Sequence, residues 1–143
     1  MILTKSILSA YEKGLAAQEN SYAPYSNFKV GAALKVQGSD EIFVGCNVEN
    51  ASYGATICAE RNAIWSSVAK LGKQKLDFLI VITNTEEPSV PCALCLQVLS
   101  EFDEGDLPIY LANHEGIKYM IYLCELLPRP FTSFPKNNEV VIE

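Results

Sequence analysis

The stretch "LDFLIVIT" (residues 76–83) is a continuous apolar run of strand length in a chain of 143 residues. Such a run is typical of a central strand that is covered on both faces of a sheet. Helical patterns flank it, at residues 57–71 before it and at residues 91–102 after it. Helices that alternate with strands predict a layered α/β structure with crossover connections.

The remaining segments extend this layered order. Residues 3–19 have apolar side chains at helical spacing, and Thr4 is a suitable N-cap. Strand-like runs on either side of "QGSD" (residues 37–40) predict a hairpin. Later segments predict a strand, then a strand or a strand plus helix, then a short terminal element, at residues 107–113, 117–123 and 124–131. We expect an α/β fold, a three-layer αβα sandwich with a mixed five-stranded sheet, in one domain over residues 1–143.

Composition narrows the class of protein. Seventeen acidic and eleven basic residues give a net charge of −6, so a polynucleotide is not an expected partner. No segment reaches the ~20 apolar residues of a membrane span, and the N-terminus is a poor signal peptide. Five cysteines, an odd number, favour reduced thiols in a cytoplasmic protein.

Three of the cysteines predict a metal site. Cys58 opens one predicted helix, while Cys92 and Cys95 open another at C-x-x-C spacing. Thiolates in this pattern can converge on one zinc ion at about 2.3 Å, and three protein ligands leave a fourth position open, as in catalytic zinc sites. Glu60 follows Cys58 closely, where a general acid and base would act without coordinating the metal.

Other interpretations of the cysteines remain open. The C-x-x-C pair could be a redox pair, although the thioredoxin type stands early, after a first strand. A structural zinc site would need a fourth ligand, and the only histidine, His114, lies in the turn-like "NHEG". Cys46 and Cys124 flank apolar residues and are expected to be core thiols.

Four motifs, which together span Tyr22 to Phe131, occur in the order of a known family. They are "APYSNFKVGAAL", "GCNVENASYGATICAERNAI", "PCALCLQVLSEF" and "ELLPRPF". This set resembles the small cytidine deaminases, the homotetrameric, three-cysteine branch of the zinc-dependent deaminases. The resemblance implies Zn²⁺ held by Cys58, Cys92 and Cys95, a zinc-activated attack on C4 of cytosine, and proton transfer by Glu60 to N3 and the leaving amine.

The resemblance also implies the substrate contacts. Asn47 and Glu49 match the pair that holds the ribose 3′-hydroxyl, Phe28 matches an aromatic residue that packs on the base, and the N–H of Ala59 matches a donor to its 2-carbonyl oxygen. Phe131 corresponds to an aromatic residue that reaches a neighbouring subunit's site. The resemblance therefore implies a small nucleoside substrate and a homotetramer with sites shared between subunits.

One motif departs from the family pattern. This chain has "PCALCLQ" where "PCGACRQ" is usual, so Leu96 replaces an arginine that offsets the thiolate charge. Either Arg61 alone balances the site and restoring Arg at position 96 raises turnover, or Leu96 packs against the sheet or a subunit. Ala93 and Leu94 could also reshape the pocket.

Three hypotheses for function follow. The first is deamination of cytidine and deoxycytidine. The second is an aminohydrolase that acts on a different or modified pyrimidine nucleoside, and the third is a zinc-binding protein that has lost catalysis. Glu60 argues against the third, because a scaffold has no need of that carboxylate.

Overall fold

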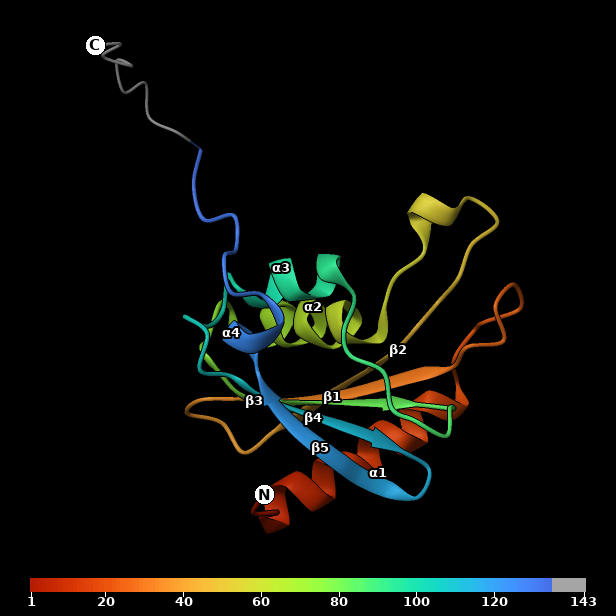
Figure 1. The fold of residues 1–143 in the computed structure, drawn as a ribbon, viewed down its shortest axis with the longest axis horizontal. Coiled ribbons are helices and arrows are strands. Elements are labelled where there is room, and N and C mark those ends of the chain that lie inside the picture. The colour runs from red at the N-terminus through yellow and green to blue at the C-terminus, as the bar shows by residue number, and fades with distance from the viewer. Residues whose placement is uncertain (135–143) are drawn as a thin grey trace.

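A five-stranded sheet lies between two layers of helices in residues 1–134, the part of the chain that this computed structural model describes (Figure 1). The helices are α1 (Lys5–Glu19), α2 (Ala59–Leu71), α3 (Ala93–Leu99) and α4 (Leu123–Leu126), with a 3₁₀ turn η1 (Tyr53–Ala55). The strands are β1 (Val30–Val36), β2 (Ile42–Cys46), β3 (Leu76–Thr83), β4 (Pro108–Asn113) and β5 (Gly116–Tyr122). The one-domain prediction also covers residues 135–143, which lie outside the described residues.

The strand order is β2-β1-β3-β4-β5, which puts the "LDFLIVIT" strand at the centre. β3 pairs with β1 in antiparallel and with β4 in parallel orientation, and the two outer pairs are antiparallel. All of β3 except Asp77 is buried. The predicted mixed five-stranded sheet is therefore confirmed.

Each face of the sheet has its own apolar layer. α1 covers one face, where Ile7 and Ala10 pack with Ile80 and Ile82 of β3. α2, α3 and α4 cover the other, and Figure 1 shows α1 on the opposite side of the sheet from α2 and α3. None of the helices in the described part of the chain is long and apolar enough to cross a membrane. Helices on both faces of the sheet make the three-layer αβα architecture.

The two helices beside β3 begin later than the sequence predicts. Cys58 and Cys92 have extended backbones and are the N-caps of α2 and α3, so the helices start at Ala59 and Ala93. The prediction for α1 also shifts to Lys5, and Thr4 is its N-cap as expected, since Thr4 Oγ1 accepts a hydrogen bond from Ile7 N at 3.3 Å.

Two side chains on the helices are exposed. Trp65 lies on the outer side of α2, opposite the buried Ala63 and Ile64, and is 53% exposed. Cys124 is exposed because α4 buries Leu123 alone, which corrects its prediction as a core thiol. Cys46 is only partly buried.

A glycine sets how closely α2 approaches the sheet. A Cβ at Gly45 of β2 would lie 2.4 Å from Ala59 O and 2.6 Å from Ala63 N, distances that real Cβ atoms do not show. Both neighbours are backbone atoms of α2, so neither can turn aside. The absence of a side chain at Gly45 therefore allows the first turn of α2, with Cys58 and Glu60, to rest directly on β2.

We expect Gly45→Ala to lower the free energy of unfolding by about 2 kcal/mol, because the added methyl group pushes α2 away from β2. Urea unfolding followed by circular dichroism would measure the change. Gly54→Ala in η1 is the matched control, since a Cβ there meets no atom within 4 Å. Equal stability of the two variants would show that the approach of α2 to β2 tolerates a side chain.

Candidate active site

Three cysteine sulfurs meet beyond the edge of the sheet where α2 and α3 begin. The ligand atoms of Cys58, Cys92 and Cys95 all lie within 4.8 Å of one another. Cys92 Sγ is 3.7 Å from Cys58 Sγ and 3.5 Å from Cys95 Sγ. Cys58 and Cys92 come from the two N-caps, while Cys95 is one turn into α3 and buried.

The sulfur cluster fits a zinc ion. Two sulfurs that each lie about 2.3 Å from one tetrahedral metal are about 3.8 Å apart, close to the spacing seen here. Thiolate donors favour zinc over magnesium or calcium. The described residues place no fourth His, Cys, Asp or Glu in this group. The site is therefore a three-cysteine zinc site with an open position.

One guanidinium balances the sulfur charge. Arg61 Nη2 donates a hydrogen bond of 3.3 Å to Cys58 Sγ, and Arg61 Nε is buried without a partner among the described residues. A hydrogen bond from Cys95 and the charge of Arg61 outweigh burial and lower the pKa of the Cys58 thiol to about 5. Cys58 is thus prepared to bind metal as a thiolate.

Leu96, at the position of the family's second arginine, is a buried apolar side chain. It is 6% exposed and belongs to the apolar layer between α3 and the sheet, whereas Leu94 is 65% exposed. This burial favours the interpretation that Leu96 packs, rather than the one in which a missing arginine alters the metal. Leu94 does not line the cavity described below, so a reshaped pocket has no support from that side chain.

Glu60 is a buried carboxyl beside the sulfurs. It is 3% exposed in the first turn of α2, and burial raises the pKa of its carboxyl to about 7, to which the nearby Cys58 thiolate also contributes. A carboxyl with this pKa can both give and accept a proton near neutral pH.

A cavity of about 230 Å³ opens onto these groups. Its lining includes Cys58, Cys92 and Glu60, and also four residues that the sequence predicted as substrate contacts: Phe28, Asn47, Glu49 and Ala59. Ala59 N–H has no intrahelical partner, because it belongs to the first residue of α2. The structure thus brings together the start of β1, the loop that follows β2, the start of α2, the end of β3 and the loop before α3.

The two polar residues of the cavity are held by hydrogen bonds. Asn47 is buried; its Oδ1 accepts from Val30 N at 2.8 Å and from Ser21 Oγ, and its Nδ2 donates to Phe28 O at 2.8 Å. One Nδ2 hydrogen remains for a ligand. Asn47 therefore also fixes the chain that carries Phe28.

Glu49 fixes the same loop from its other side. Its carboxylate accepts hydrogen bonds from Tyr25 N at 2.9 Å, from Ser26 N at 3.2 Å and from Ser26 Oγ. The bond from the Ser26 side chain is the main reason that the pKa of Glu49 is lowered. Glu49 thus stays an anion that accepts hydrogen bonds.

Sequence reasoning missed one residue that shapes the cavity. Asn84, just after β3, accepts a hydrogen bond from Lys29 N at 2.9 Å and donates to Asn27 O at 3.1 Å. Asn27 has a φ of 57°, a left-handed conformation that asparagine tolerates. These hydrogen bonds set the turn from which Phe28 reaches the cavity. In the sequence, the only signal for this role was an asparagine directly after the predicted strand.

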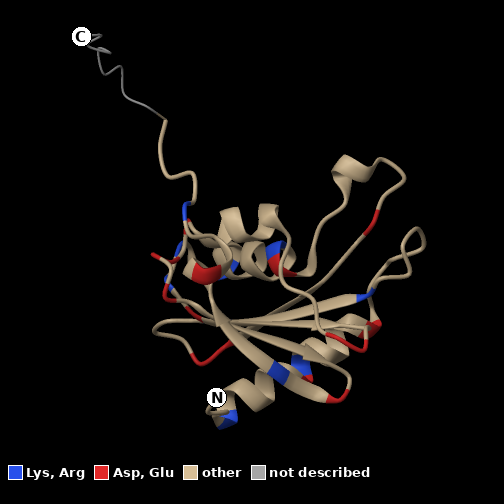
Figure 2. Cartoon of the chain, in the orientation of Figure 1, with Lys and Arg blue, Asp and Glu red and all other residues tan. Residues whose placement is uncertain are grey.

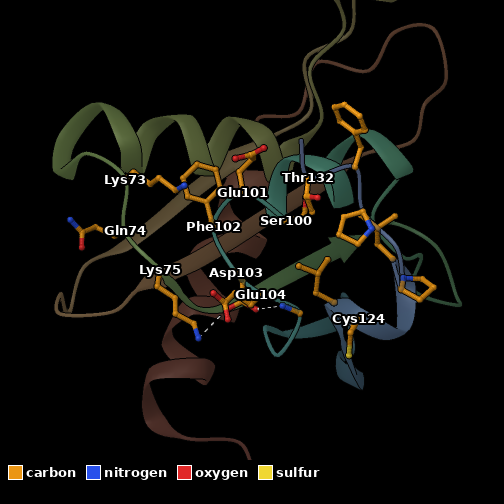
Figure 3. A pocket seen from close by; sticks show the side chains of 16 residues that line it. Lys73, Gln74, Lys75, Ser100, Glu101, Phe102, Asp103, Glu104, Cys124 and Thr132 are labelled. Carbon is orange, nitrogen blue, oxygen red and sulfur yellow. Dashed lines mark hydrogen bonds and ion pairs between the residues drawn. The ribbon is translucent and has the colours of Figure 1, made fainter. Parts of the chain in front are cut away.

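Phe131 lies elsewhere. It does not line the cavity of its own chain, but borders a larger hollow of about 820 Å³ (Figure 3). That hollow holds the ion pair between Lys75 and the buried Asp103, and it contains none of the three site cysteines. The chemistry is therefore in the smaller cavity.

Three thiolates with an open coordination position, beside a buried carboxyl in a small cavity, define a catalytic zinc centre of the hydrolytic class. Residues 5–111 match the sequence profile of the cytidine and deoxycytidylate deaminase zinc-binding region. The chain therefore belongs to the cytidine and deoxycytidylate deaminase family, as the sequence resemblance predicted.

Individual relatives are similar to this protein over most of the chain. The cytidine deaminase of Halalkalibacterium halodurans is 39% identical over 127 residues, 89% of this chain and 95% of that protein. The cytidine deaminase of Sporosarcina psychrophila is 42% identical over 116 residues, 81% of this chain and 84% of that protein. The crystal structure of cytidine deaminase from Burkholderia pseudomallei matches with a TM-score of 0.80 and 41% identity, covering 90% of this chain and 100% of that chain.

We expect Cys95→Ser to reduce bound zinc from about one ion per chain to a small fraction of that, because one of only three protein ligands is lost. Elemental analysis after gel filtration would measure the metal. Cys124→Ser, which changes an exposed thiol outside the cluster, should keep its zinc. Full zinc in Cys95→Ser would contradict the three-sulfur site.

We expect Leu96→Arg to lower the free energy of unfolding by about 3 kcal/mol, since a charge enters an apolar layer. Leu94→Arg, two residues away on the exposed side of α3, should change it by less than about 0.5 kcal/mol. Urea unfolding of both zinc-loaded variants provides the comparison. A stable Leu96→Arg protein with faster turnover would favour the charge-balance interpretation instead.

Proposed function

We propose that this protein catalyses the hydrolytic deamination of cytidine and deoxycytidine to uridine and deoxyuridine, with release of ammonia. The observation that supports this most directly is the position of the buried Glu60 in one small cavity with the sulfurs of Cys58 and Cys92. The named activity of the relatives, at about 40% identity, supports the same substrate.

Glu60 is the proposed proton carrier. When bound, zinc lowers the pKa of a water molecule to about 7 and so supplies the nucleophile for C4 of the base. The Glu60 carboxylate would take one proton from the attacking water and deliver it to N3. A second proton, from the hydroxyl group then on C4, would pass through Glu60 to the amine, which leaves as ammonia. The Glu60 pKa of about 7 supports both transfers.

The cavity walls are proposed to orient the nucleoside. Phe28 packs against the base, and the free N–H of Ala59 donates to the 2-carbonyl oxygen. Glu49 accepts a hydrogen bond from the ribose 3′-hydroxyl and the remaining Nδ2 hydrogen of Asn47 donates to it. A site built around these polar groups rejects a substrate that lacks the sugar, because the groups would be left unpaired.

Charge supports a nucleoside over a nucleotide. The ionisable side chains that line the cavity are Glu49, Glu60 and two cysteines, without a lysine or arginine among the described lining residues. The adjoining hollow, which shares Glu49 and Thr56 with the cavity, adds no cation. A 5′-phosphate would meet carboxylates here and no partner. Figure 2 shows both signs of charge scattered over the described chain, without the basic stripe that a polynucleotide would require.

The free-energy cost of burying the Glu60 carboxyl also supports a catalytic role for it. A buried carboxyl without a fixed cationic partner destabilises the fold, so a zinc-binding protein without activity would gain by losing it. This cost favours an enzyme over a scaffold. An aminohydrolase for a modified pyrimidine nucleoside is the second candidate. The cavity fixes the groups proposed to contact the sugar more firmly than the groups proposed to contact the edge of the base.

We also propose a homotetramer in which Phe131 completes the site of a neighbouring subunit. Phe131 is 57% exposed and lies outside the cavity of its own chain, and Tyr53 and Trp65 are exposed as well. Large exposed aromatic side chains are typical of an interaction surface. Zinc binding requires reduced thiols, which supports the cytoplasm as the compartment.

We expect the zinc-loaded protein to convert cytidine to uridine, measured as loss of cytosine absorbance, and to convert cytidine 5′-monophosphate at least about tenfold less efficiently. Glu60→Gln should lower kcat by roughly 10²- to 10⁴-fold while zinc is retained, because the amide cannot carry the proton. Glu12→Gln, on the exposed side of α1, is the matched control. A zinc-loaded wild type that is inactive on cytidine would contradict the proposal.

A further inference from the structure

The side chain of Gln97 binds the main chain of a single distant residue with both of its polar atoms. Gln97 Oε1 accepts a hydrogen bond from Phe131 N at 3.1 Å, and Gln97 Nε2 donates to Phe131 O at 2.7 Å. A glutamine amide that pairs with the N–H and C=O of one residue acts as a neighbouring strand would act. This pair of bonds fixes the position and the orientation of the Phe131 backbone.

The residue that makes these two hydrogen bonds, Gln97, lies on a rigid element. Gln97 belongs to α3, two residues after the zinc-site Cys95, and the flanking Leu96 and Leu99 are buried in the apolar layer against the sheet. A helix that is anchored on both sides by buried leucines cannot slide or rotate freely. Phe131 therefore has a fixed position relative to the cysteines of its own chain.

The segment around Phe131 has little other support. Within the described residues, the two bonds to Gln97 are the only hydrogen bonds from residues 128–134 to the rest of the chain. The Phe131 ring meets Phe134 edge to face, with ring centroids 5.4 Å apart, and remains more than half exposed. A backbone held at two points thus presents an aromatic ring that lies outside the smaller cavity of its own chain.

We propose that Gln97 is a positioning residue, which holds Phe131 ready for the substrate site of a neighbouring subunit. The inference rests on the proposed sharing of sites between subunits and extends it: α3 supplies two cysteines to one site and, through Gln97, orders the aromatic residue that closes another. Without Gln97, residues 128–134 would have to be ordered each time substrate binds, and that cost would weaken binding.

The first test compares KM with kcat for cytidine. Gln97→Met keeps the length of the side chain but cannot form either bond, so KM should rise about three- to tenfold, more than kcat falls, with zinc content unchanged. Gln74→Met is the matched control, because Gln74 (Figure 3) is exposed and its side chain donates a hydrogen bond to Leu71 O rather than to Phe131. Equal KM values for Gln97→Met and wild type would overturn the inference.

A double-mutant cycle tests whether Gln97 acts through Phe131. In a Phe131→Ala background the Gln97→Met substitution should add less than about twofold to KM, since the ring that Gln97 positions is already gone. Additive effects of the two substitutions would overturn a positioning role.

Mixed oligomers test whether the effect crosses between subunits. Gln97→Met chains assembled with about a tenfold excess of Glu60→Gln chains keep active sites, but receive Phe131 from neighbours whose Gln97 is intact. The KM of these sites should return close to the wild-type value. A KM that stays high would place the effect within one subunit and overturn the inference, whereas a wild type without deaminase activity would overturn the proposed function as well.

Discussion

The direct contact between the backbone of α2 and Gly45 of β2 is the constraint on which the site depends. Because no side chain separates the two elements, the N-terminal turn of α2 rests on β2, the edge strand of the sheet. Cys58 and Glu60 then line one cavity with Val81 and Thr83 of β3. α3 lies in the crossover between the parallel strands β3 and β4, and its N-terminal end brings Cys92 and Cys95 to Cys58. A small displacement of either helix would separate the sulfurs.

The site concentrates charge in a nearly closed space. Three sulfurs and the Glu60 carboxyl share this volume with one guanidinium, from Arg61, and each group alters the ionisation of the others. Glu60 is held near neutral pKa by burial rather than by a partner, at a cost to stability. The apolar layer around Leu96 and the close packing of α2 supply the stability that offsets this cost.

Much of the fold could be predicted from the sequence because its signals are local. The apolar run of β3, the helical spacing of α1 and α2, and the spacing of the cysteines each depend on a few neighbouring residues. The site residues came from motifs of the family. The burial of Leu96, the exposure of Trp65 and Cys124, and the bonds of Asn84 and Gln97 could not be predicted, because they depend on which segments meet in space.

The distance along the chain between the zinc ligands has a consequence for folding. Cys58 is 34 residues from Cys92, and β3 with its flanking loops lies between them. In the folded protein the three sulfurs meet while β3 lies between β1 and β4, so their convergence is a non-local contact that carries a loop-closure cost. During synthesis on the ribosome, the emerging chain has no native metal site until almost two thirds of it has been made. Binding of metal at the native site thus stabilises the assembled sheet.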